Sequence, residues 1–118
     1  MIKSISFQKE FISLIKSDKK TVTRRIKTNL KAGDICYFKV GRFGRKQGYL
    51  KICNTMMVRL RDIRGDTREL EKEGFYNDYP KCLIEFIDLW YFINKKNCRW
   101  QDNPYVYRIR FEYLGENI

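Results

Sequence analysis

The chain has 118 residues, which is the size of one ordinary domain and leaves no room for a second core. Hydrophobic residues make up 43% of it and aromatic residues 15%, which allows a packed core and argues against general disorder. Its 25 Lys and Arg residues against 14 Asp and Glu residues give a formal net charge of +11. An excess of this size favours a polyanionic partner, namely RNA, DNA, a nucleotide or an acidic surface, over a basic protein without one.

The cysteines and the apolar stretches indicate a cellular compartment. None of the four cysteines forms a C-x-x-C pair, and the chain has no histidine, so neither a metal site nor a cofactor is predicted. The first residues, MIKSISFQKE, lack an apolar signal core. The longest apolar stretch, CLIEFIDLWYFI, is too short to span a bilayer and contains Glu85 and Asp88. We therefore expect a cytoplasmic monomer with reduced thiols and no membrane segment.

The first half of the chain predicts one helix between strands. IKSISF alternates as a strand does, and QKEFISLIKSDKK places apolar residues at the spacing of an amphipathic helix. TVTRRI has the β-branched content of a strand. LKAGDICYFKV predicts a turn followed by a strand over residues 35–40, and the glycines of GRFGRKQG predict a hairpin loop.

The second half predicts a long strand, two helices and a closing strand. Residues 49–62 suit one long or kinked strand. A helix should begin at Asp66, with Glu69 three residues on, and end at Gly74. A second helix should open at Pro80, with an apolar face that includes Trp90. The last strand, YVYRIRFEYL, alternates strictly between two faces.

This order of elements predicts an α+β fold. Hairpins between the middle strands indicate a mostly antiparallel sheet or a small barrel of about five to six strands. The helical segments should pack at the ends of these strands. The whole chain, residues 1–118, is expected to form a single domain.

Several stretches in sequence order resemble the ASCH domain, a branch of the PUA-like β-barrels. They are a helix followed by SDKKTVTRR, then LKAGDICYFKVG, a long strand that leads to EKEGF, and an aromatic helix. The resemblance runs from about Ile5 to Trp90. Its most specific pieces are a K-T-x-T-x-R core and an EGF triplet, formed by Lys20, Thr21, Thr23, Arg25, Glu73, Gly74 and Phe75.

The resemblance implies a cleft lined by the K-T-x-T segment and a role related to RNA. Some small bacterial members are amidohydrolases that remove the acyl group from N4-acetylcytidine. Their lysine, their threonine three residues later and their distant glutamate correspond here to Lys20, Thr23 and Glu73. Those enzymes usually carry a non-basic residue where this chain has Arg24. This departure bears on acetylcytidine as the substrate more than on the cleft itself. Other members are reported as ribonucleases.

The chemistry of these three residues depends on their surroundings. An ordinary lysine is protonated at neutral pH, but burial and cationic neighbours lower its pKa. A neutral Lys20 could take a proton from Thr23 or from water, and Glu73 could protonate the departing amine. Lys20 and Thr23 can face one cleft only if the strand begins at about Thr21, because residues three apart in a strand point to opposite faces.

The basic residues around this segment predict contacts with phosphate. Adjacent arginines place one guanidinium on each side of a strand, and guanidinium forks match phosphate oxygens. The hairpin loop adds a basic rim with aromatic side chains on which bases can stack. The predicted phosphate-binding or nucleic-acid-binding residues are Thr21, Arg24, Arg25, Arg42, Arg45 and Lys46.

Three functions remain open at this point. The first is a hydrolase acting on a modified nucleoside, a nucleotide or RNA, with a ribonuclease as its weaker form because the chain has no histidine. The second is a module that binds RNA in the same cleft without catalysis. The third is a small regulator that binds an acidic protein partner.

Overall fold

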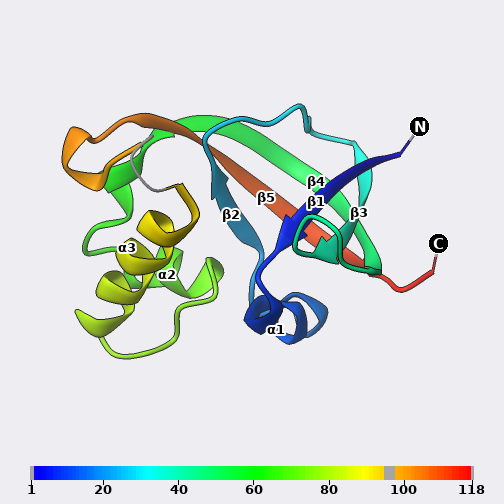
Figure 1. Cartoon of the computed structure of the whole chain (residues 1–118), viewed down its shortest axis with the longest axis horizontal. Helices are drawn as coiled ribbons and strands as arrows, with labels where there is room; N and C mark the ends of the chain where they lie inside the picture. The colour runs from blue at the N-terminus through cyan, green and yellow to red at the C-terminus, as the bar shows by residue number, and fades with distance from the viewer. Residues whose placement is uncertain (1, 95–97, 118) are drawn as a thin grey trace.

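The computed structural model describes residues 2–94 and 98–117. They form five strands, two of them long, and three α-helices, one of them long (Figure 1). The strands are β1 (Lys3–Phe7), β2 (Val22–Arg25), β3 (Ile35–Val40), β4 (Lys46–Arg59) and β5 (Tyr105–Gly115). The helices are α1 (Ile12–Lys16), α2 (Thr67–Lys72) and α3 (Lys81–Asn94), with short 3-10 turns at Lys9–Phe11, Leu60–Ile63 and Trp100–Asp102.

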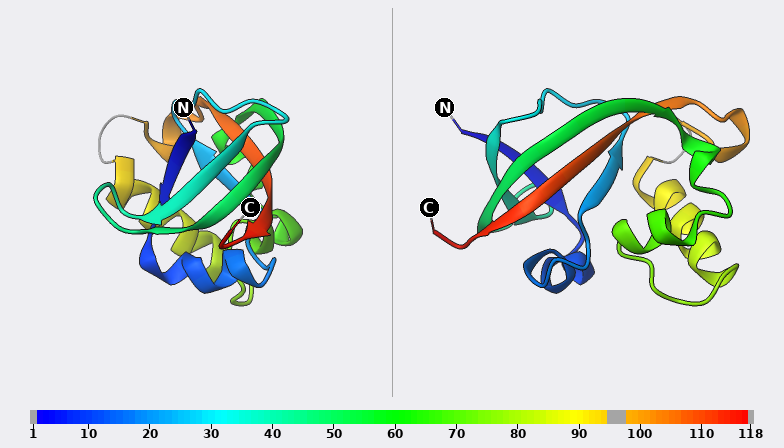
Figure 2. Two further views of the ribbon diagram at one scale, coloured as in Figure 1. Left: turned by 90° about the vertical axis from the view of Figure 1, so that its right-hand side faces the viewer. Right: turned by 180° about the vertical axis from the view of Figure 1, so that it is seen from behind.

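The five strands make one curled sheet in the order β1-β3-β4-β5-β2 (Figure 2). β1 pairs with β3 in parallel, and the other three pairings are antiparallel. The predicted α+β class and the mostly antiparallel sheet are therefore confirmed. The predicted barrel is not, because among the described strands β1 and β2 are both edges and do not pair with each other.

Strands β4 and β5 connect two hydrophobic clusters. Ile109 and Phe111 of β5 belong to the first cluster, which lies among the strands and α1. Val106 belongs to the second cluster, which includes Leu70 of α2 and Phe86 of α3. Val106 stands on the opposite side of the strand from Ile109 and Phe111, so both faces of β5 are buried at different points along it. The strict alternation in the sequence could not reveal this change of face.

Helix α1 is shorter than the sequence pattern predicts. The expected helix consists of a 3-10 turn followed by α1, which ends at Lys16. Asp18 then adopts a left-handed conformation (φ 60°), and the backbone N–H groups of Lys19 and Lys20 both donate to the Leu14 carbonyl (2.8 and 3.0 Å). This helix ending resembles a Schellman motif. It turns the chain so that Lys20 stands just before β2.

Helix α2 begins and ends as the sequence predicts. The Asp66 carboxylate accepts a hydrogen bond from the Glu69 backbone N–H (3.1 Å), and Gly74 follows with φ 103°. A Cβ at Gly74 would lie 2.8 Å from Cε1 of Phe11, so this position requires glycine for both its conformation and its packing. Glu73, the preceding residue, forms ion pairs with Lys20, just before β2, and with Arg24 within it.

In the part of the chain that the structure describes, no helix is both long enough and apolar enough to cross a membrane.

Candidate functional site

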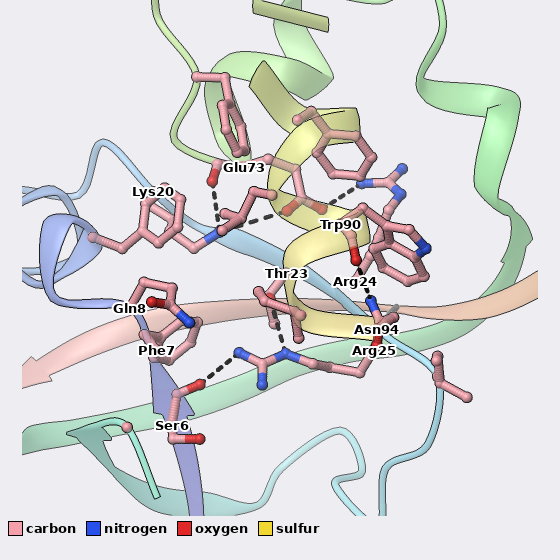
Figure 3. Close-up of a pocket in the computed structure, with 17 residues that line it drawn as sticks. Ser6, Phe7, Gln8, Lys20, Thr23, Arg24, Arg25, Glu73, Trp90 and Asn94 are labelled. Atoms are coloured by element: carbon pink, nitrogen blue, oxygen red, sulfur yellow. Dashed lines mark hydrogen bonds and ion pairs between the residues drawn. The ribbon is translucent and has the colours of Figure 1, made fainter. Parts of the chain in front are cut away.

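A pocket of about 160 Å³ opens beside the two sheet edges, between β1 and β2 on one side and α3 on the other (Figure 3). Its walls are largely aromatic and include Phe7, Phe11, Phe86 and Trp90. Four polar or charged side chains in it are also almost fully buried, which is unusual for such residues. They are Lys20, Thr23, Arg24 and Glu73.

Lys20 lies at the centre of this polar group. Its Nζ donates to the carbonyl oxygens of Val22 (2.8 Å) and Glu73 (2.6 Å) and lies 3.5 Å from Oε1 of Glu73. Burial lowers the pKa of Lys20 to about 8; Glu73 opposes this shift, and the charges of Arg25 and Arg24 add to it. Because β2 begins at Val22, Lys20 precedes the strand, and it lines the same pocket as Thr23.

Arg24 is held by two carboxylates. Its Nη1 lies 2.7 Å from Oε2 of Glu73 and 3.0 Å from Oε1 of Glu69. Arg108, opposite Arg24 in the antiparallel register, donates to the same Glu69 carboxylate. Although burial alone would raise it, the pKa of Glu69 is held below its ordinary value by Arg108 and Arg24.

Arg25 links the two edges of the sheet. Its Nε donates to Oγ1 of Thr23 (3.1 Å), and its Nη2 donates to the Ser6 carbonyl on β1 (2.7 Å). Its guanidinium also lies 5.0 Å from the centre of the Phe7 ring. Burial lowers the pKa of Arg25 to about 10, with Glu73 opposing the shift. Within residues 2–94 and 98–117, no carboxylate forms an ion pair with Arg25.

The predicted catalytic residues therefore line one pocket, but they are not all bonded to one another. Lys20 contacts Glu73, whereas the Thr23 hydroxyl accepts a hydrogen bond from Arg25. No hydrogen bond joins Lys20 and Thr23 among the described residues. Thr21 lies outside the pocket, with its backbone N–H bonded to the Lys72 carbonyl (2.9 Å).

The predicted basic rim lies on the exposed connection between β3 and β4 and on the first residue of β4. Arg42, Arg45 and Lys46 are all exposed there. Lys46 Nζ donates to the Tyr49 hydroxyl (2.7 Å). The loop meets the pocket at Gly41, which lines it and donates its backbone N–H to the Phe7 carbonyl (3.0 Å).

Sequence reasoning missed the residues that hold Arg24. The sequence pattern gives Glu69 only a place at a helix start and Arg108 only a place in the alternating last strand. The signal that could have joined them is the register that sets Arg24 opposite Arg108, with α2 packed over this pair. Register of this kind depends on long-range pairing, which the local pattern does not determine.

The positions of the cysteines and acidic residues show whether they could form a metal site. All four cysteines are free, and three of them, Cys36, Cys82 and Cys98, are buried. Throughout residues 2–94 and 98–117, no three His, Cys, Asp or Glu side chains are grouped so that they could hold a metal ion.

Comparison with known proteins defines the fold. No family model matches the chain, and no curated protein matches it either. A solved hypothetical protein, PH0355, is 20% identical, with a TM-score of 0.68 over 97% of this chain and 100% of that one. A DUF984-family protein from Enterococcus faecalis has a TM-score of 0.72 at 11% identity, over 98% of this chain and 82% of that one.

An ASCH domain from Lactobacillus crispatus gives a TM-score of 0.69 at 10% identity, covering 96% of this chain and 80% of that one. The chain thus has an α+β fold shared by a group of small solved domains. That fold is the ASCH domain fold, as the resemblance in the sequence predicted.

Proposed function

We propose that this protein is a hydrolase that removes an acyl group from the base of a nucleoside or nucleotide, with Lys20, Thr23 and Glu73 as its catalytic residues. The observation that carries the proposal is the buried Lys20, whose pKa is lowered to about 8 in a pocket shared with Thr23 and Glu73. Buried ionisable groups with shifted pKa values in a cleft are typical of active sites.

The size and walls of the pocket support a base as the group that enters. A cavity of about 150 Å³ holds one benzene molecule. The pocket of about 160 Å³ therefore suits one planar ring rather than a length of RNA. Phe7, Phe11 and Trp90 offer apolar surfaces against that ring, and Gln8 and Asn94 offer amide groups to its polar edge.

The proposed reaction begins with Lys20. With a pKa of about 8, about a tenth of the molecules carry a neutral Lys20 at pH 7. Neutral Lys20 removes the proton of the Thr23 hydroxyl, and the Thr23 oxygen attacks the acyl carbonyl carbon. The bond from that carbon to the base nitrogen then breaks, leaving an ester on Thr23, and water hydrolyses this ester to the free carboxylic acid.

The partners of Glu73 change the role that the sequence suggested for it. Two cations lie within 2.7 and 3.5 Å of its carboxylate, so its oxygens already serve as the partners of Arg24 and Lys20. In the proposed mechanism Lys20 therefore returns its proton to the departing nitrogen, and Glu73 orients Lys20 through its carbonyl and carboxylate oxygens. The Lys20–Thr23 contact forms when substrate enters, as catalytic hydrogen bonds often do.

The test is turnover of N4-acetylcytidine and a panel of other N-acyl nucleosides, measured by the release of the deacylated nucleoside and the free carboxylic acid. Lys20→Ala should abolish turnover, whereas the control Lys19→Ala, which removes an adjacent exposed charge, should keep it. No turnover of any member of the panel by the native protein would contradict the proposal.

A second function is favoured by the hydrogen bonds of Lys20 itself. Two carbonyls and one carboxylate surround its Nζ, an arrangement that also suits a purely structural lysine. In that case the protein would bind RNA without catalysis, through the pocket and the basic loop of Arg42, Arg45 and Lys46. Its affinity would then fall steeply with salt, with a log–log slope of about −0.7 for each phosphate contacted on a single strand. Binding of an acidic protein partner is the third prediction, and a pull-down would test it.

A further inference from the structure

The charges that line the pocket do not balance. Lys20, Arg24 and Arg25 are cationic, and Glu73 is the acidic residue among the described lining residues. Behind them Glu69 and Arg108 form an ion pair, which leaves the balance unchanged. With Lys20 protonated, the pocket thus holds two positive charges in excess. Unbalanced charge in a buried place is costly, and proteins normally pair it.

The excess is concentrated at Arg25. The charge of Arg24 faces Glu73 and Glu69, and that of Lys20 faces Glu73. Arg25 has the Thr23 hydroxyl and the Ser6 carbonyl as its partners, and both are neutral. These bonds use only part of the donors of a guanidinium. In the part of the chain that the structure describes, its remaining N–H groups have no partner.

Arg24, which also lines the pocket, carries a buried donor without a partner in the described part of the chain. Its side chain is almost fully buried, yet its Nε has no hydrogen-bond partner among the described residues. Buried donors without partners are rare in folded proteins and call for an explanation. A negatively charged ligand would supply the partner that the charge of Arg25 lacks, and a polar group of the same ligand could accept from Arg24.

We propose that the pocket takes a nucleotide that carries a phosphate monoester, with the base inside and the phosphate on Arg25; this inference rests on the proposed function of the pocket. A monoester carries a charge of about −1.5 to −2 at pH 7, which matches the two excess positive charges. A neutral nucleoside supplies no charge, and a phosphodiester supplies only one. The preferred ligand is therefore a mononucleotide or a phosphorylated end of RNA.

The position of Arg25 fits this arrangement. Its side chain is half-buried and lies between the two sheet edges, so it can reach both the pocket and the solvent. The ring-sized cavity leaves no room for a phosphate beside a base. Guanidinium groups bind phosphate oxygens in pairs, and they do so more strongly where water is partly excluded.

The experiment is calorimetric titration at pH 7 of the native protein with cytidine, cytidine 5′-monophosphate and cytidine 3′-monophosphate. A short oligoribonucleotide with and without a terminal phosphate forms a second arm, which distinguishes a free nucleotide from an RNA end. The variants are Arg25→Gln, Arg25→Lys and, as a control for net charge, Arg110→Gln. Arg110 is exposed on β5 and lies outside the pocket.

We expect at least one monophosphate to bind about tenfold or more tightly than cytidine, the effect of one charge-assisted hydrogen bond. Arg25→Gln should remove this preference, Arg25→Lys should keep part of it, and Arg110→Gln should leave it intact. Equal binding of cytidine and its monophosphates, or a preference that survives in Arg25→Gln, would overturn the inference. If acyl nucleosides are still hydrolysed in either case, the proposed function stands. Absence of all binding and of all turnover would overturn both.

Discussion

Two basic segments of this chain have similar composition and opposite surroundings. The segment that enters β2 carries Lys20 and Arg24, whose side chains are each 3% exposed and are paired with carboxylates. The connection between β3 and β4 carries Arg42 and Arg45, which are exposed, beside Phe43, which is 92% exposed. Both were predicted from sequence as phosphate-binding segments.

The difference teaches that burial, rather than the type of residue, decides what a cation can do. In the pocket Lys20 and Arg24 each face a fixed carboxylate partner, and desolvation lowers the pKa of Lys20 to about 8. On the loop the charges stay hydrated and act through long-range attraction, which salt screens. The first segment therefore suits chemistry, and the second suits the capture of a polyanion.

The largest effect should come from removing the carboxylate that the buried cations share. Glu73→Gln leaves Lys20 and Arg24 close together without the charge that pairs them. We expect the free energy of unfolding to fall by about 3–5 kcal/mol, as for other broken buried ion pairs. The control Glu71→Gln, on the exposed side of α2, should change it by less than about 0.5 kcal/mol. Urea unfolding measures both, and equal small losses would contradict the account.

Substituting two glycines tests how tightly the two regions are packed, one at the end of α2 and the other in the exposed loop. Gly74 and Gly41 both have positive φ (103° and 62°), but a Cβ at Gly74 would meet Phe11 at 2.8 Å and one at Gly41 would meet nothing within 4 Å. Gly41→Ala should cost about 1–2 kcal/mol of backbone strain. Gly74→Ala should cost about 2–4 kcal/mol, because overpacking is added to the strain. Thermal unfolding measures the difference, and equal losses would show that the site accommodates the extra methyl group.

The lowered pKa of Lys20 predicts how stability changes with pH. The folded protein releases the proton of Lys20 near pH 8, whereas the unfolded chain keeps it until about 10.5. Between these values the unfolded state binds more protons, so this group makes the protein more stable as pH rises. In this window the free energy of unfolding of the native protein should rise, relative to that of Lys20→Met, by up to about 1.4 kcal/mol per pH unit. Parallel stability curves for the two proteins from pH 7 to 10 would contradict this prediction.

The smallest effect on stability should come from the exposed loop. Arg42→Ala and Arg45→Ala should each change the free energy of unfolding by less than about 0.5 kcal/mol. If the loop contacts RNA, each should also reduce the slope of log affinity against log salt by about one phosphate contact. Fluorescence anisotropy of a labelled oligoribonucleotide over a series of salt concentrations measures this slope. An unchanged slope would remove the loop from the binding surface.

The fold was largely predictable because its signals are local. The start of α2 at Asp66, the end at Gly74 and the strand over residues 35–40 all follow from turn, capping and alternation patterns. The short α1 was not predictable, because the left-handed Asp18 ends it inside a pattern that continues as a helix. The unclosed sheet also escaped prediction, since strand order depends on long-range pairing.

The sequence predicted which residues make up the candidate site better than it predicted the ion pairs and hydrogen bonds between them. The resemblance in the sequence named Lys20, Thr23, Arg25 and Glu73, and the structure brings all four to one pocket. It gave no reason to expect the ion pairs of Arg24 with Glu69 and Glu73, which arise only when α2 packs over β2. Because of these contacts Arg24 is paired with carboxylates, whereas the adjacent Arg25 has only neutral partners among the described residues.

The central claim is that burial gives Lys20 a chemistry that exposed lysines lack. The most direct measurement is an NMR titration of the side-chain Cε and Hε signals of Lys20 in protein labelled with ¹³C-lysine, with Lys20→Met to assign the signal. The account predicts a pKa of about 8 for this side chain, against an ordinary value of 10.5. A Lys20 signal that titrates at 10.5 or above would contradict it, because such a lysine could not act as a base near neutral pH.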